Sequence, residues 1–465
     1  MKNKVFSFLF VLVLIVAGIT VKPVEAGAYT TPFTTSITYQ NVGTGPATIS
    51  LTFYAETSSS PITITLPELA KMAGTSIYVG NVGDIANGFK GSAVMSSNQP
   101  IVATMVQVAA GTSPVKVRPL SNGFTAGSDY VLIPTVLKAK YDYNSVVSVQ
   151  NVDTVANDYR LVFVPVSGSS ITVNTTNVPA GSTKFYDLGK MSQIPAGFNG
   201  SLQVFATRTG GSDKGVVVAS AMELGIASNY GYAFEGTNTF ANTVYMPSAM
   251  CKYKGVHDSS YAVQNTTNAD VSVTVKYSNG TNDGPYTLAA GAKRSFVGCA
   301  ANPNGFIGSA VIEASGAIVA MGKVYGGGLS TAFLGFTQGG AQVALPYVRW
   351  TTAHWADGTR QRAYIAIQNV GTEALAEGAV VVEYYDKSGN LVDTKPLPAM
   401  APGGKANSTP EGLMGGEFGY YNDNTYGGSA VVKGPAGSKL AVVVRIQQKA
   451  GSLDVAEDYT GVTIQ

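Results

Sequence analysis

Short stretches in which apolar and polar residues alternate, separated by turn-forming residues, occupy most of the chain. Alternation with a period of two is typical of β-strands that bury one face. Residues 128–237 show this best, in stretches rich in Val, Ile, Thr and Tyr at 130–137, 145–152, 157–166, 169–178, 182–188, 200–208 and 215–224. Such a series of short strands predicts an antiparallel β-sandwich of immunoglobulin-like type. The last two strands are expected to form a hairpin at a turn such as 211–215.

Three landmarks recur in the same order along the chain. The first is a strand ending in Gln-Asn, at Gln40-Asn41, Gln150-Asn151, Gln264-Asn265 and Gln368-Asn369. The second is a Gly-Phe-x-Gly-Ser pattern that begins at Gly88, Gly197 and Gly305, with Thr425-Tyr426 in the fourth copy. The third is a short segment with an aromatic residue, beginning at Gly123, Ala233, Gly335 and Asp458. Landmarks repeated in one order predict an array of four similar units.

The predicted fold is therefore all-β, a tandem array of four immunoglobulin-like antiparallel β-sandwich domains after an N-terminal signal peptide. Each repeat has a common domain size and is long enough to bury its own core. The predicted segments are 1–26 for the signal peptide and 27–127, 128–237, 238–340 and 341–465 for the four repeats.

The Gln-Asn landmark is interpreted as structural and not as a binding motif. Ile37 and Tyr39 lie on one face of the predicted strand, with the smaller Thr38 between them. Asn41 then ends the strand, because its short amide bonds to the backbone two residues further on and favours a turn.

The N-terminus has the features of a secretory signal peptide. Lys2 and Lys4 precede an apolar run from Val5 to Val16, and Val24 and Ala26 fit a small-x-small cleavage site. The mature chain would begin at the next residue, a glycine. The alternative is a retained membrane anchor, but the run is shorter than the ~20 apolar residues that a spanning helix needs. A secreted, extracellular or cell-surface protein without a membrane span is expected.

Charge adds information about partners. Charged residues make up 12% of the chain, and removing residues 1–26 takes away three lysines and one glutamate of the 30 basic and 28 acidic residues. The mature chain then has no net charge, which disfavours nucleic acid as a partner and favours association. An ordinary secreted protein near its isoelectric point would look the same.

The strand end "QNVGT", the strand and turn "VVVEYYDKSGN" and the "GFxGSAV" strand together resemble secreted bacterial cell-surface proteins with tandem immunoglobulin-like or CARDB-like (cell-adhesion-related) repeats. The resemblance covers essentially all of the mature chain. It implies a structural, adhesive or scaffold role outside the cell, and it brings no catalytic residues.

Residues for catalysis or metal binding are sparse. The chain has two histidines, His257 and His354, and none of the common hydrolase, zinc-protease or nucleotide-binding motifs. His257 and Asp258 are interpreted as a solvated loop pair. We expect no enzyme activity, no cofactor and no metal site, although dispersed carboxylates leave acid–base hydrolysis open.

Two features remain as candidate sites. Cys251 and Cys299 predict a disulfide within the third repeat, with free thiols or an intermolecular link as the alternatives. The stretch 347–362 contains Trp350, Trp355 and Arg349, residue types that concentrate binding energy at interfaces. The alternative is that both tryptophan rings cover the end of their own sandwich.

Two functions follow from these observations. The first is a non-catalytic structural subunit of an extracellular filament, sheath or surface layer, which self-associates or binds another cell-surface protein. The second is a soluble adhesion or carbohydrate-binding protein that contacts glycans through Trp350 and Trp355.

Overall fold

The computed structural model describes residues 33–56, 60–110, 113, 115–352, 359–450 and 453–464. The predicted signal peptide and Trp355 lie outside these residues. Apart from three short 3-10 turns, the described elements are strands, and all their pairings are antiparallel. The prediction of an all-β fold with several antiparallel sheets is confirmed. No described helix has the length and apolarity to cross a membrane.

The sheets fall into four groups of consecutive strands, here called units 1 to 4, and among the described residues no sheet takes strands from two units. Unit 1 contains β1 (Phe33–Asn41), β2 (Ile49–Ala55), β3 (Ile62–Thr65), β4 (Gly74–Tyr78), β5 (Gly91–Ser97), β6 (Ile101–Ala109) and β7 (Leu120–Asn122). Unit 2 contains β8 (Tyr130–Lys138), β9 (Tyr143–Asn151), β10 (Asn157–Pro165), β11 (Ile171–Val178), β12 (Thr183–Asp187), β13 (Phe198–Arg208), β14 (Val217–Gly225) and β15 (Tyr230–Glu235).

The second half of the chain follows the same plan. Unit 3 contains β16 (Ala241–Cys251), β17 (Asp258–Asn265), β18 (Val271–Tyr277), β19 (Asn282–Leu288), β20 (Lys293–Val297), β21 (Phe306–Gly326) and β22 (Leu329–Leu334). Unit 4 contains β23 (Gln342–Leu345), β24 (Arg360–Asn369), β25 (Val381–Tyr385), β26 (Leu391–Pro396), β27 (Lys405–Ser408), β28 (Ser429–Lys433), β29 (Leu440–Ala450), β30 (Leu453–Thr460) and β31 (Val462–Thr463).

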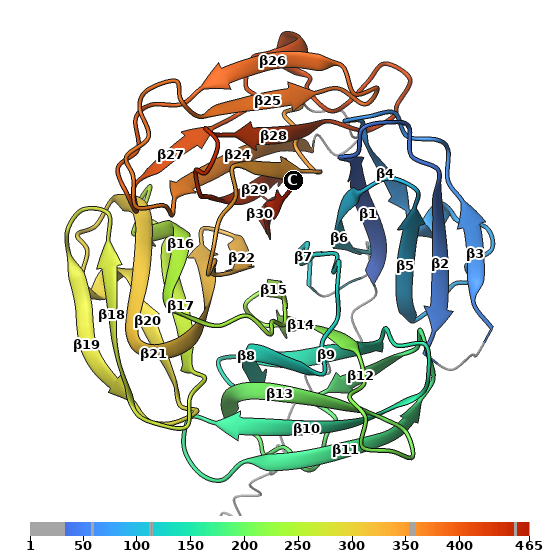
Figure 1. Cartoon of the computed structure of the whole chain (residues 1–465), viewed down its shortest axis with the longest axis vertical. Coiled ribbons are helices and arrows are strands. Elements are labelled where there is room, and N and C mark those ends of the chain that lie inside the picture. Colours follow the sequence, from blue (N-terminus) through green and yellow to red (C-terminus); the bar gives the residue numbers. More distant parts are fainter. Residues whose placement is uncertain are drawn as a thin grey trace, which may run out of the picture.

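The four units form a closed ring, with β7, β15, β22 and β30 at its centre (Figure 1). Each unit has its own buried apolar cluster, and three of these clusters include side chains of the next unit around the ring. Met321 and Ala332 join the cluster of unit 2, and Val443 joins that of unit 3. Val106 and Leu120 of unit 1 join the cluster of unit 4, so apolar packing also closes the ring between the two ends of the chain.

The predicted hairpin between the last two strands of each repeat is wrong. In unit 2, β13 pairs with β10 and β8, whereas β14 pairs with β9 and β15 in the other sheet. The connection therefore crosses from one sheet to the other. In unit 3 the crossing needs no turn, because β21 runs unbroken through both halves of the sandwich. In immunoglobulin domains the corresponding strands are neighbours in one sheet, and the first strand lies in the sheet of the second strand. Here β8 pairs with β13 and β14 pairs with β9, so the order differs at the first and the last strand.

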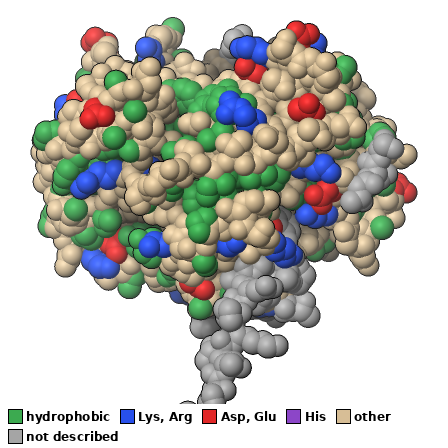
Figure 2. Space-filling model, turned by 90° about the horizontal axis from the view of Figure 1, so that it is seen from below, with side chains coloured by type: hydrophobic (Ala, Val, Ile, Leu, Met, Phe, Trp, Pro, Cys, Tyr) green, Lys and Arg blue, Asp and Glu red, His purple; other side chains and the backbone are tan. Residues whose placement is uncertain are grey.

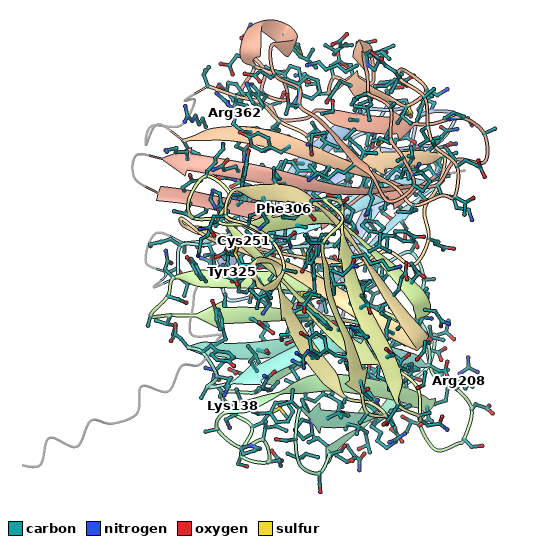
Figure 3. All side chains as sticks on the ribbon, turned by 90° about the vertical axis from the view of Figure 1, so that its left-hand side faces the viewer. Lys138, Arg208, Cys251, Phe306, Tyr325 and Arg362 are labelled. Atoms are coloured by element: carbon teal, nitrogen blue, oxygen red, sulfur yellow. A yellow bond between two sulfur atoms is a disulfide. The ribbon has the colours of Figure 1, made fainter. Side chains whose placement is uncertain are left out.

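A disulfide bond joins Cys251 to Cys299 in unit 3, the pair that the sequence indicated. Cys251 lies at the end of β16 beside Phe306 of β21 (Figure 3). The bond closes a loop with a sequence separation of 48 residues and ties β16 to the turn after β20.

Reduction of this bond is expected to destabilise unit 3 by ~4 kcal/mol in the chain-entropy model. The other units have no disulfide, because these are the two cysteines of the chain. Thermal unfolding of the protein with and without reductant tests the prediction, with a Cys251→Ala/Cys299→Ala variant, which should not respond to reductant, as the control. An unchanged unfolding profile after verified reduction would contradict it.

Candidate functional site: the seams and the centre of the ring

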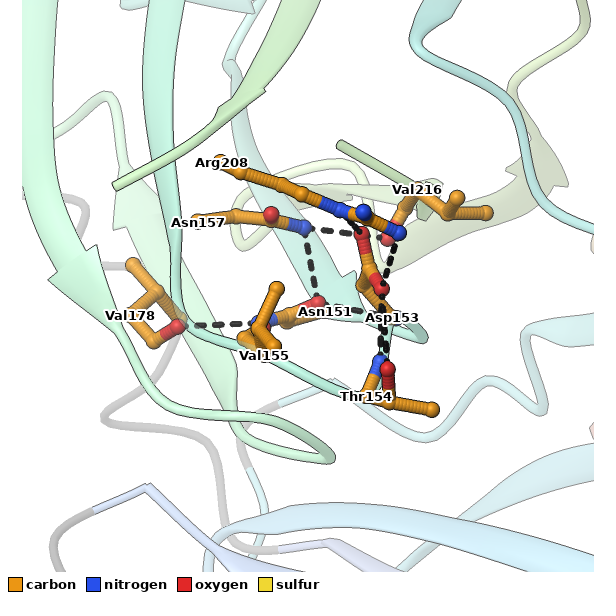
Figure 4. Close-up of polar contacts among 8 residues, drawn as sticks. All are labelled: Asn151, Asp153, Thr154, Val155, Asn157, Val178, Arg208 and Val216. Atoms are coloured by element: carbon orange, nitrogen blue, oxygen red, sulfur yellow. Dashed lines mark hydrogen bonds and ion pairs between the residues drawn. The ribbon is translucent and has the colours of Figure 1, made fainter. Parts of the chain in front are cut away.

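The asparagine of the first landmark makes the same three contacts in every unit. In unit 2, Asn151 donates from Nδ2 to Val155 O (2.8 Å) and Val178 O (2.9 Å), and its Oδ1 accepts from Asp153 N at 2.9 Å (Figure 4). The equivalent bonds are made by Asn41, Asn265 and Asn369. One buried amide thus closes the turn after the strand and holds a second loop against it, which supports the structural interpretation.

The contacts between neighbouring units are here called seams, and the serine of the second landmark makes a hydrogen bond across them in units 1, 3 and 4, but not in unit 2, where Ser201 has no hydrogen-bond partner among the described residues. Ser92 Oγ of unit 1 donates to Gly181 O of unit 2 at 3.2 Å. Ser309 Oγ of unit 3 donates to Gly403 O of unit 4 at 3.0 Å. These serines, and the equivalent Ser429, bond to the same turn of the next unit, so the second landmark builds the ring as well as the sandwich.

Ser429 closes the ring between units 4 and 1. Its Oγ donates to Met72 O at 3.1 Å and accepts from Gln40 Nε2 at 2.9 Å. Gln368 makes a comparable contact at the seam of units 3 and 4, donating to Ala310 O at 3.2 Å and Gly403 O at 3.0 Å. The two residues of the Gln-Asn pair therefore have different roles: the asparagine closes a turn, and the glutamine lies at or near a seam.

The aromatic residue of the second landmark packs edge-on against a ring of β2, β10 or β18 in the first three units: Phe53–Phe89, Phe163–Phe198 and Tyr277–Phe306. Unit 4 differs from the other units, although the sequence placed Tyr426 at the aromatic position of its second landmark. Tyr384 of β25 packs against Phe418 and not against Tyr426. Tyr426 instead packs on Tyr420 and under the Arg349 guanidinium.

Lys293 occupies the seam between units 2 and 3. Its Nζ donates to Asn199 Oδ1 (2.7 Å), Gly200 O (3.0 Å) and Thr135 Oγ1 (3.1 Å), all in unit 2. Burial of the amine lowers the pKa of Lys293 to about 7, and Lys323 adds to the lowering, whereas Glu223 opposes it. Lys405 is equivalent at the seam of units 3 and 4, where it donates to Gly308 O at 3.0 Å, and burial lowers its pKa to about 8.

These lysines predict that stability rises with pH. The pKa of Lys293 is below its ordinary value of 10.5 in the folded protein, so the unfolded chain binds the proton more tightly and folding loses stability as pH falls from about 10 to about 7. The effect on the free energy of unfolding is of the order of 1–2 kcal/mol. It is smaller than the full pKa shift would give, because the Lys293 side chain is partly exposed and solvent screens its charge. Melting temperatures across this range should rise less with pH in Lys293→Met than in the unaltered protein. Equal slopes in the two proteins would contradict the prediction.

The centre of the ring is formed by strands that contain the third landmark in units 2 and 4 and end just before it in units 1 and 3. β7, β15, β22 and β30 contact one another in a closed circle. Asn122 Nδ2 of unit 1 donates to Thr460 O of unit 4 at 2.8 Å, and Asn122 N donates to the half-buried carboxylate of Glu235 in unit 2. Burial raises the pKa of Glu235. Side chains from units 1, 2 and 4 thus meet at one point.

Buried ion pairs surround this centre. Arg118 Nε of unit 1 lies 2.8 Å from Glu457 Oε2 of unit 4, and the Glu457 side chain is fully buried. Lys323 of unit 3 pairs with the fully buried Glu223 of unit 2. A third pair joins Arg445 to Asp458, at 2.7 Å, within unit 4. Two of the three pairs therefore join different units.

The candidate contact site around Trp350 is largely internal. Arg349 is 7% exposed, and its guanidinium donates to Gln361 Oε1 and Ser76 Oγ. The prediction that Arg349 offers a surface contact is wrong, because its charge lies in the seam between units 4 and 1. Trp350 packs against the core of unit 4, and Arg362 (labelled in Figure 3) lies 4.6 Å from its ring centroid.

Chemistry at the histidines is limited. His257 Nδ1 lies 3.0 Å from Gly326 O, and burial lowers its pKa. Asp258 is not solvated as expected, because it is buried and pairs with Lys252. Asp258 and the two cysteines are the one cluster of potential metal ligands in the described part of the chain, and both sulfurs are held in the disulfide. His354 lies outside the described residues.

Comparisons with known proteins give no family. No protein-family model matches the chain, and no curated protein matches it. A solved tetra-tandem repeat from the extending region of a large adhesion protein aligns with 91% of this chain and 93% of its own length, at 13% identity and a TM-score of 0.09. A TM-score this low supports no conclusion about fold or function, so the resemblance to CARDB-like repeats stays a prediction.

Proposed function

We propose that this protein is a secreted, non-catalytic structural component of an assembly at the cell surface. The observation that carries the proposal is the use of the repeated landmarks. Their asparagines, serines and central strands are engaged in turns, seams and the ring centre. Because the repeated residues build the scaffold, the sequence pattern is accounted for without a substrate or cofactor.

The proposal includes the finer organisation of the chain. Residues 1–26 act as a signal peptide, and each unit is one sandwich domain of immunoglobulin-like architecture with altered strand order at its two ends. The disulfide supports an oxidising compartment. Charged side chains of both signs are spread over the face shown in Figure 2, which supports association without long-range charge steering.

Negative-stain electron microscopy of residues 27–465 over a concentration series tests the proposal. We expect four-lobed rings that form regular arrays as concentration rises, and mass spectrometry of the native protein should place its N-terminus at Gly27. Isolated rings at every concentration together with specific glycan binding would favour the adhesion alternative instead.

A further inference from the structure

In the described part of the chain, unit 1 lacks the first strand that each of the other three units has. In unit 2 the strand β13 pairs on one side with β10 and on the other with β8, the first strand of the unit. In units 3 and 4, β16 and β23 pair in the same way with β21 and β28. The equivalent strand in unit 1 is β5, which pairs with β2 and ends the sheet order β3-β2-β5.

The core of unit 1 is open where the strand is lacking. Ala93 and Met95 of β5 are partly exposed. The side chains at the equivalent positions of β13, β21 and β28 are buried to 1% exposure or less: Leu202, Val204, Ala310, Ile312, Ala430 and Val432. The neighbouring β6 shows the same contrast, because Ile101 and Ala103 are partly exposed whereas their equivalents in unit 2, Val217 and Ala219, are buried.

The first strands of units 2, 3 and 4 show which sequence pattern fits the edge of β5. Each first strand carries two buried apolar residues separated by one residue and followed by proline. In unit 2 these are Val131, Ile133 and Pro134. Units 3 and 4 have Val244, Met246, Pro247 and Val343, Leu345, Pro346. An extended segment of this pattern would pair with β5 and cover Ala93 and Met95.

The chain's own N-terminus is too short to supply that strand after the proposed cleavage. Cleavage before Gly27 leaves residues 27–32 ahead of β1. In unit 2 the link between the first and second strands takes residues 139–142, and the first strand itself spans Tyr130–Lys138. Six residues cannot provide both a link and a strand, since each strand residue advances only ~3.3 Å.

We propose that the open edge of β5 receives a β-strand donated by another protein chain, with two apolar residues separated by one residue and followed by proline. A folded second copy cannot donate its own strand of this pattern, because Val131 and Ile133 are buried in unit 2. The donor is therefore a different exported protein with an extended segment of this chemistry. The inference rests on the proposed export and cleavage, and it gives the structural component a specific partner contact.

A defined peptide tests the edge. The probe is a labelled peptide with the sequence of residues 128–138, which contains the unit 2 first strand, and its binding to residues 27–465 is measured by fluorescence anisotropy. We expect saturable binding that weakens at least tenfold when the peptide carries Val131→Asp and Ile133→Asp. Hydrogen exchange should slow in β5 on binding and stay unchanged in β26, an outer strand of unit 4.

Several outcomes would overturn the inference. These are no binding to residues 27–465, equal binding of the two peptides, or protection outside β5. Binding that appears only when residues 27–32 are removed would show that the chain's own segment occupies the edge. Ala93→Arg in the protein should abolish binding of the peptide. If that variant does not fold, the comparison of the two peptides still tests the contact, because it leaves the protein unaltered. Regular arrays in the electron microscope without peptide binding would support the proposed structural role and contradict the proposal of a donated strand at β5.

Discussion

Replacing Arg118 by methionine is expected to lower the free energy of unfolding by about 3–5 kcal/mol, because it leaves a buried carboxylate without its cation. Arg118 Nε lies 2.8 Å from Glu457 Oε2, and the Glu457 side chain has no exposed surface. Tyr347 OH still donates to Glu457 at 2.9 Å in the variant, but a neutral hydroxyl does not replace a charge. Thermal or denaturant unfolding measures the loss.

A matched control is the ion pair between Lys214 and Asp129 in unit 2. Its atoms are 2.9 Å apart, but the Lys214 side chain is 80% exposed. Lys214→Met should therefore change stability by less than about 1 kcal/mol. Adding Glu457→Gln to Arg118→Met should recover part of the loss, since the unpaired charge is removed. Equal effects of the two single substitutions would show that burial of the pair is not what stabilises it.

Arg118 also tests the closure of the ring. It belongs to unit 1, whereas Glu457 belongs to unit 4, and no strand pairing joins the described parts of these units. In Arg118→Met, hydrogen exchange should quicken first in β7 and β30, which contact each other at the centre. Faster exchange in unit 2 alone would point to a loss of packing that is unrelated to closure.

Much of the local structure was predictable from the sequence. The seven alternating stretches of residues 128–237 correspond to β8–β14, with ends that differ by a few residues. Alternation signals a strand because one face is buried, and Asn151 signals a turn because its amide bonds locally. Both signals depend on residues that are close together in the sequence, so a local sequence pattern is enough to reveal them.

The ring and the strand order within units were not predictable in this way. Whether β14 pairs with β13 or with β9 depends on which sheet the chain enters after the turn, and the alternation is the same in both cases. Closure depends on contacts such as Gln40 to Ser429, which are 389 residues apart. The central strands β7, β15 and β22 were missed because three to six residues are too few to show a period. β30 is longer, but residues 455–459 are all buried, so apolar and polar positions do not alternate there.

Arg349 shows how composition misleads about exposure. Tryptophan and arginine within one polar stretch are typical of an interface, and here the interface lies between units of one chain. Ser76, which accepts a hydrogen bond from Arg349 at 2.8 Å, is 273 residues away in the sequence. No local signal separates a contact with a partner from a contact with a distant part of the same chain.

Asn151→Ala is expected to lower the free energy of unfolding by about 3 kcal/mol, close to the largest losses from single polar side chains. The substitution removes four hydrogen bonds at once, because Asn151 Oδ1 also accepts from Asn157 Nδ2 at 2.8 Å. It also removes the Asn151 donor from the buried carbonyl of Val178, and the loss of a buried hydrogen bond is costly. Denaturant unfolding with hydrogen exchange of unit 2 measures the effect.

Two further variants separate the hydrogen bonds from the size of the side chain. Asn151→Asp keeps the volume and the acceptor for Asp153 N, but it turns an oxygen toward the carbonyls of Val155 and Val178, so its loss should be at least as large as that of alanine. Asn174→Ala, on exposed β11 of the same unit, should change stability by less than about 0.5 kcal/mol. If Asn151→Asp were neutral, the landmark asparagine would act by filling space, and its recurrence in all four units would need another explanation.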